Sequence, residues 1–200
     1  MAISRDNVVV ALGASTGGTR AMSVVLSALP EDFPCILVVQ HMPPHFTRMH
    51  ADSLEQACAM TVREARNGDL VERGIVLIAP GDDHMRLIRT TTGLLAVSCV
   101  PGPKVSGHCP SVDELFFSVA KTDGIKAIGV ILTGMGNDGA RGLCEMRRRG
   151  AFTIGQNEQT CVVYGMPKEA YEMGGVCRQA PLGEIADLLI RHVGAEFLNR

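Results

Sequence analysis

Residues 7–18 read NVVVALGASTGG, and the rest of the chain can be arranged around this stretch. An apolar run over residues 8–12 ends in a glycine-rich turn, and a candidate helix over residues 19–29 follows. The pattern predicts a strand–turn–helix with Ser15 at the crest of the turn. Residues 13–17 match the Gly-x-Ser-x-Gly nucleophile elbow, in which backbone N–H groups at the start of the helix can stabilise an oxyanion. The stretch therefore predicts a nucleophilic Ser15.

Phosphate binding is the main alternative for the same turn. Glycine-rich turns after a first strand bind dinucleotides when they read G-x-G-x-x-G, but here Ser15 stands at the third position. The G-x-x-x-x-G-K-[ST] phosphate loop is absent as well. From this stretch alone, a non-catalytic α/β module that binds a ligand at residues 13–18 stays open.

Composition indicates one domain with an aliphatic core. The chain has 200 residues, of which 46% are apolar and 4% aromatic, so methionine is expected to fill gaps in the core. A net charge of −2 gives no electrostatic case for nucleic acid or an anionic membrane. No apolar run approaches the roughly 20 residues that cross a bilayer. The seven cysteines are odd in number and lack a C-x-x-C spacing, which argues against a zinc site and disulfides and favours a cytoplasmic location.

Strand and helix signals alternate along the chain. Continuous apolar runs indicate buried parallel strands, and the segments between them read as helices. Residues 84–88 and 94–97 flank a polar turn and predict an antiparallel hairpin at the edge of the main sheet. The expected class is α/β, a three-layer doubly wound, mostly parallel sheet with an antiparallel edge hairpin. A capping box, Ser111 with Glu114, is expected to begin the helix after the hairpin.

Three chemically able residues each follow a predicted buried strand. Ser15 follows residues 8–12, His41 follows residues 35–39, and Asp138 comes after residues 127–132. Parallel strands end at one edge of a sheet, which is where open α/β folds bind ligands. A serine, a histidine and an aspartate are the parts of an acyl-transfer triad. The order Ser–His–Asp differs from the Ser–Asp–His order of α/β-hydrolases, so that fold is rejected.

Other residues compete for the two supporting roles. His45 and His84 are alternatives to His41 as the base. Asp82 or Asp83 could orient His84, and an aspartate before glycine, such as Asp138, is often only a turn former. The residues themselves leave both pairings open.

Six blocks carry a resemblance to one family. In order they are GASTGGTRAM, VVQHMPPHFTRMHADSL, IAPGDDHM, HCPSVDELFFSVA, GVILTGMGNDGARGL and QNEQTCVVYGMPKEA. Together they resemble the catalytic domain of the chemotaxis receptor methylesterases, the CheB family, over residues 7–192. The resemblance implies Ser15 as nucleophile, His41 as general base and Asp138 as its orienting partner, with oxyanion donors near Thr16 and Met135.

The resemblance also implies an activity. Family members hydrolyse glutamyl γ-methyl esters on chemoreceptor helices and deamidate glutamines, without a metal or organic cofactor. Many carry a receiver domain before the esterase. No receiver domain is expected in this chain, so residues 1–200 are taken as a single methylesterase domain. A related serine esterase acting on another side-chain ester is a further alternative.

Overall fold

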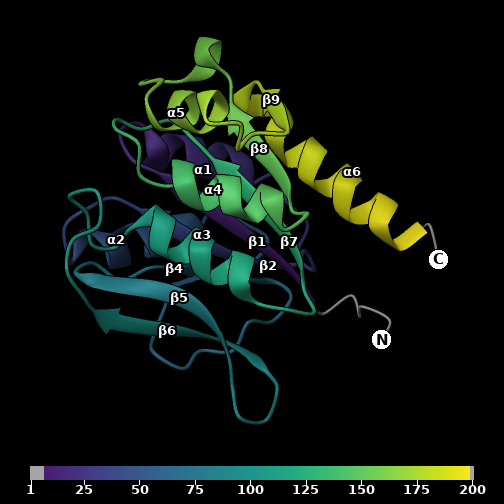
Figure 1. Ribbon diagram of the computed structural model, residues 1–200. Helices are drawn as coiled ribbons and strands as arrows, with labels where there is room; N and C mark the ends of the chain where they lie inside the picture. Colours follow the sequence, from purple (N-terminus) through teal and green to yellow (C-terminus); the bar gives the residue numbers. More distant parts are fainter. Residues whose placement is uncertain (1–6, 199–200) are drawn as a thin grey trace.

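The computed structural model describes residues 7–198, and a seven-stranded parallel sheet runs through its centre (Figure 1). The strand order is β3-β4-β2-β1-β7-β8-β9, and every neighbouring pair is parallel. The strands are β1 (Val8–Ala14), β2 (Cys35–Gln40), β3 (Thr61–Glu64), β4 (Ile75–Ile78), β7 (Lys126–Ile131), β8 (Phe152–Gln156) and β9 (Arg178–Ala180).

Helices cover both faces of the sheet, which makes three layers (Figure 1). The helices are α1 (Gly18–Leu26), α2 (Phe46–Glu55), α3 (Val112–Lys121), α4 (Ala140–Arg148), α5 (Met166–Glu172) and α6 (Ile185–Leu198). Alternate residues of β1 enter two separate cores. Val8, Val10 and Leu12 pack with α1, α2 and α6, whereas Val9 and Ala11 pack with α3, α4 and α5. The doubly wound α/β class predicted from the sequence is confirmed.

The predicted antiparallel hairpin is present as β5 (Asp83–Arg89) and β6 (Leu95–Pro101). Its expected place at the edge of the main sheet needs correction, because the two strands pair with each other in a sheet of their own. The hairpin instead packs on the α3 side of the molecule, where Met85, Leu87 and Val97 join the core. The Leu87 N–H also donates to Ser118 Oγ of α3 over 2.8 Å, which ties the hairpin to that helix.

The strand order reverses beside β1. Outward from β1, the strands β2, β4 and β3 lie on one side, and the later strands β7, β8 and β9 lie on the other. At such a switch point the loops after the two central strands diverge and leave a crevice at the carboxyl edge of the sheet. The loops after β1, β2 and β7 therefore meet where the sequence predicted the site.

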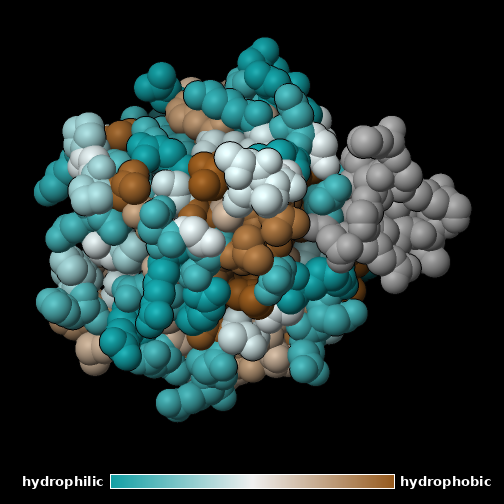
Figure 2. All heavy atoms as spheres, turned by 90° about the horizontal axis from the view of Figure 1, so that it is seen from below, coloured by the Kyte–Doolittle hydropathy of each residue, from teal (hydrophilic) through white to brown (hydrophobic). Residues whose placement is uncertain are grey.

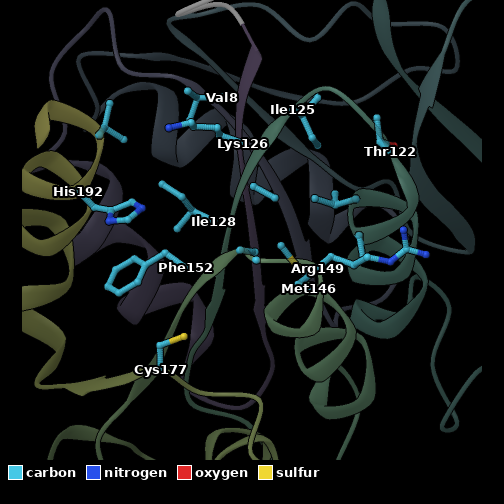
Figure 3. Close-up of a pocket in the computed structure, with 16 residues that line it drawn as sticks. Val8, Thr122, Ile125, Lys126, Ile128, Met146, Arg149, Phe152, Cys177 and His192 are labelled. Carbon is cyan, nitrogen blue, oxygen red and sulfur yellow. The ribbon is translucent and has the colours of Figure 1, made fainter. Parts of the chain in front are cut away.

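A cavity of about 420 Å³ opens at the opposite end of the sheet, by the amino ends of β1, β7 and β8 (Figure 3). Val8, Lys126, Ile128 and Phe152 line it together with His192 of α6. Viewed from below, apolar side chains gather near the middle of the molecular surface among hydrophilic ones (Figure 2). Within residues 7–198 no helix is both long and apolar enough to span a membrane.

Candidate active site

Ser15 and His41 follow two strands that are in register with each other. Ala14 at the end of β1 pairs with Gln40 at the end of β2, and the His41 N–H donates to the Ala14 carbonyl over 3.1 Å. Neighbouring strands lie about 4.8 Å apart. Ser15 and His41 are the next residues along each strand, so they leave the sheet side by side.

The loop after β7 completes the edge. The Ser15 N–H donates to the Thr133 carbonyl over 3.0 Å, so this loop starts directly beside the elbow. A Cβ added to Gly134 would lie 2.9 Å from Cβ of Ser15, which shows how closely the two turns pack. The same loop carries Asp138 back toward the histidine, and the structure thus brings all three predicted residues together.

His41 and Asp138 form a buried pair. His41 Nε2 lies 2.7 Å from Asp138 Oδ2, and the two side chains are only 6% and 1% exposed. A carboxylate oxygen accepts, so Nε2 carries the proton and Nδ1 of a neutral ring keeps its lone pair. Nδ1 is buried and has no partner among the described residues. The ring therefore has one nitrogen fixed and one free to accept a proton.

The Ser15 hydroxyl makes no hydrogen bond to His41 within residues 7–198. Such contacts are often long in unliganded sites and tighten when the substrate binds. Ser15 itself is half-buried at the carboxyl edge of the sheet.

Asp138 is held as a carboxylate by the start of α3. Besides His41, it accepts from Ser111 Oγ at 2.8 Å, from Val112 N at 2.8 Å and from Asp113 N at 3.0 Å. Burial on its own raises the pKa of this carboxyl, but the hydrogen bonds from His41, the two backbone N–H groups and Ser111 outweigh it and leave the pKa below its usual value. The positive end of the helix dipole acts in the same direction. The negative charge that orients His41 is thereby secured.

His84, the competing histidine, has both nitrogens engaged elsewhere. Its ring is fully buried, Nδ1 accepts from the Ser111 N–H at 3.2 Å, and Nε2 donates to the Pro103 carbonyl at 2.8 Å. This also corrects the expected capping box. Ser111 Oγ caps α3 by accepting from Glu114 N at 3.4 Å, but the Ser111 N–H goes to His84, and the Glu114 carboxylate pairs with Arg86.

The remaining competitors are not placed for the role. His45 is exposed at the N-cap of α2, in the left-handed region with φ 72°. Neither Asp82 nor Asp83 hydrogen-bonds to His84. Among the described histidines, only His41 pairs with a carboxylate.

The two predicted oxyanion donors sit on clamped peptides. The Ser15 carbonyl accepts from Gln40 Nε2 at 3.0 Å and from the Gly18 N–H at 2.7 Å. The N–H of Thr16 belongs to the same planar trans peptide, so it points the opposite way. It has no partner among the described residues.

The loop after β7 repeats this arrangement. The Gly134 carbonyl accepts from the N–H groups of Gly165 and Met166, at 3.0 and 2.8 Å. The Met135 N–H of that peptide points away from them and, within residues 7–198, is also unpaired. Two backbone donors on either side of Ser15 are thus free, as an oxyanion site requires.

Apolar side chains stand exposed around the elbow. Met135 and Val162 are each 67% exposed, and a Cβ added to Gly17 would come within 2.7 Å of Val162. Gly17 itself has φ 80° at the start of α1, a conformation that suits glycine. The exposed side chains of Met135 and Val162 can therefore contact apolar parts of a substrate.

Two contributors were missed by sequence reasoning. Gln40 is 3% exposed, and besides the Ser15 carbonyl its Nε2 also donates to the His41 carbonyl at 3.0 Å. The ring of His108 stacks on that of His41. The position of Gln40 directly before His41 was a usable signal, whereas nothing in the loop around His108 indicated a contact with His41. No cluster of three potential metal ligands occurs in the described part of the chain.

A family model described as CheB methylesterase matches residues 10–189. The chain belongs to the CheB methylesterase family. The Thermotoga maritima CheB methylesterase catalytic domain has a similar structure, with a TM-score of 0.88 and 39% identity, covering 92% of this chain and 97% of that one. The family predicted from the six sequence blocks is confirmed.

Curated relatives of the family are longer than this chain. A protein-glutamate methylesterase/protein-glutamine glutaminase of Syntrophomonas wolfei is 54% identical over 183 residues, which are 92% of this chain and 53% of that protein. The protein of the same name from Escherichia coli K12 is 50% identical over 186 residues, 93% of this chain and 53% of that protein. The chain spans about half the length of these curated relatives.

Proposed function

We propose that this chain is a serine hydrolase that demethylates glutamate γ-methyl esters on chemoreceptor proteins and deamidates glutamines there. The names of the curated relatives support this choice of reaction. The observation that carries it is the buried His41–Asp138 pair. His41 lies directly beside Ser15, and its Nδ1 is free to accept a proton.

Acylation begins when His41 Nδ1 takes the proton of the Ser15 hydroxyl as its oxygen attacks the ester carbonyl. The carbonyl oxygen becomes an oxyanion that accepts from the N–H groups of Thr16 and Met135. When the tetrahedral intermediate collapses, the C–O bond to the methoxy group breaks. The leaving oxygen takes the proton from His41, so methanol departs and the glutamyl acyl group stays on Ser15.

Deacylation repeats these steps with water. His41 removes a proton from the water as it attacks the acyl carbon, and then returns that proton to Ser15. The product is a glutamate carboxylate. A glutamine side chain passes through the same acyl-enzyme but releases ammonia instead of methanol. Asp138 keeps the His41 proton on Nε2 and stabilises the imidazolium in each step.

The test compares Ser15→Ala with the parent chain. Methanol release from methylated receptor membranes should be lost, while circular dichroism remains that of the parent. A fluorophosphonate should label the parent at Ser15 and leave Ser15→Ala unlabelled. Ser53→Ala, which alters an exposed serine on α2, is the control and should keep both properties.

Three outcomes would contradict the proposal. Retained methanol release in Ser15→Ala would show that Ser15 is not the nucleophile. Stabilisation of the chain by nucleotides, with neither labelling nor ester hydrolysis, would favour the ligand-binding alternative. If the chain hydrolyses a small methyl ester but releases no methanol from receptor membranes, it would be a serine esterase that acts on another substrate.

A further inference from the structure

A second imidazole lies flat against the catalytic candidate His41. The rings of His41 and His108 are nearly parallel, with an interplanar angle of 8° and centroids 3.6 Å apart. His108 comes from the loop between β6 and α3, far along the chain from β2. The face of the His41 ring is therefore covered by a residue to which the reaction above assigns no part.

The loop that carries His108 is anchored. Val105 and His108 exchange two backbone hydrogen bonds of 2.9 Å each. The buried His84 holds the same loop by donating to the Pro103 carbonyl and accepting from the Ser111 N–H. The stack is thus fixed on both sides, because His41 is held in turn by Asp138.

The surroundings of His108 favour its neutral form. Burial and the facing His41 lower its pKa from the usual 6.5; the Asp138 carboxylate opposes this and Lys104 of the same loop adds to it. Within residues 7–198, His41, Asp138 and Lys104 are the charged or titratable side chains that shift this pKa. A neutral ring leaves His41 free to become cationic, whereas a protonated ring 3.6 Å away would oppose that charge.

We propose that His108 is a positioning residue for the base: its uncharged ring fixes the plane of His41 and permits the imidazolium, and a proton on His108 switches the site off. This inference rests on the proposed function. The serine proton still moves to His41 Nδ1 and on to the leaving group. His108 neither gains nor loses a proton during turnover.

Two substitutions separate stacking from titration. His108→Ala removes the stack and should lower kcat about tenfold or more, with KM little changed, because the orientation of the base matters most in the transition state. His108→Phe keeps a flat ring but cannot be protonated. It should recover most of the lost rate above neutral pH.

The decisive readout is the acid limb of kcat/KM, measured as methanol release between pH 4.5 and 9. In the parent, a proton on either histidine stops the reaction, so the slope of log kcat/KM against pH should exceed 1 on the acid side. In His108→Phe that slope should be 1. His192→Ala is the matched control, since His192 stacks on Phe152 at the other end of the sheet with centroids 4.2 Å apart. It should keep the steep limb.

The inference fails if His108→Ala keeps the parent kcat, or if His108→Phe keeps the steep limb. If the parent is labelled at Ser15 and releases methanol, either of these variant results would overturn the role of His108 and leave the proposed function standing. If the parent does neither, the proposed function falls first. Labelling of Ser15 in each variant, together with its thermal melt, separates misfolding from loss of positioning.

Discussion

His41 Nε2 and Asp138 Oδ2 lie 2.7 Å apart, which leaves Nδ1 as the only nitrogen of His41 able to accept a proton. In the serine proteases of the chymotrypsin type the two nitrogens have the opposite duties, with Nδ1 on the aspartate. In the mechanism proposed for this chain, Nε2 of His41 faces the aspartate and Nδ1 takes the serine proton.

Asp138→Asn should lower kcat by roughly 10³–10⁴-fold, because an amide can donate to His41 and favour the wrong tautomer. The amide group would also face backbone N–H donors from the start of α3. Methanol release at saturating substrate measures the effect. A loss of less than tenfold would mean that the His41 tautomer is set by something else.

Gln40→Leu should reduce kcat by about 10–100-fold with little change in KM. Gln40 Nε2 donates to the carbonyls of both Ser15 and His41, so its loss leaves the Ser15–Thr16 peptide held only by the Gly18 N–H. Oxyanion donors act mainly in the transition state. Steady-state kinetics and the rate of fluorophosphonate labelling should fall together, and an effect confined to KM would contradict this role.

His41→Ala and His84→Ala should differ in kind. His41→Ala should be nearly as damaging to kcat as Ser15→Ala, since nucleophile and base act as a unit. His84→Ala should instead lower the free energy of unfolding by about 1–3 kcal/mol, because the buried Ser111 N–H loses its acceptor. Urea titrations and methanol release measure the two effects, and the reverse ranking in activity would move the site to His84.

Asp113 should make stability depend on pH. Burial, with the nearby Asp138 carboxylate, raises the pKa of Asp113 to about 6 in the folded protein, against 3.8 ordinarily. The folded chain therefore binds this proton more tightly. The resulting stabilisation is fully present below about pH 3.8 and is lost as pH rises through about 6.

The comparison variant for this prediction is Asp113→Asn, which cannot titrate. A shift of about 2 pKa units corresponds to about 3 kcal/mol. Between pH 4 and pH 8 the parent should lose up to that much free energy of unfolding relative to Asp113→Asn. A difference that stays constant across this range would show that Asp113 titrates normally.

Much of the fold was accessible from the sequence because buried parallel strands are apolar on both faces. The runs over residues 8–12, 35–39 and 127–132 became β1, β2 and β7, in the centre of the sheet. The place of the hairpin was not accessible. Alternation in β5 and β6 shows which of their side chains are buried. It does not show whether the backbone N–H and C=O groups on the outer sides of the hairpin pair with a strand of the main sheet.

The site divides in the same way. Ser15, His41 and Asp138 could be predicted to meet, because each follows a strand that ends at the same edge. The stacked ring of His108 could not, since it depends on the path of a loop with no periodic pattern. The use of Nε2 toward Asp138 is likewise a matter of ring rotation, on which sequence is silent.

The bonds between the hairpin and α3 help to stabilise the part of the candidate site that holds Asp138. Leu87 and Arg86 of β5 bond to α3, and the first turn of α3 holds Asp138. Transient detachment of this small sheet would release that turn while the seven-stranded core stays intact. Amide hydrogen exchange should then find the hairpin opening at lower free energy than β1. On warming, the proposed hydrolytic activity would be lost before the seven-stranded sheet unfolds.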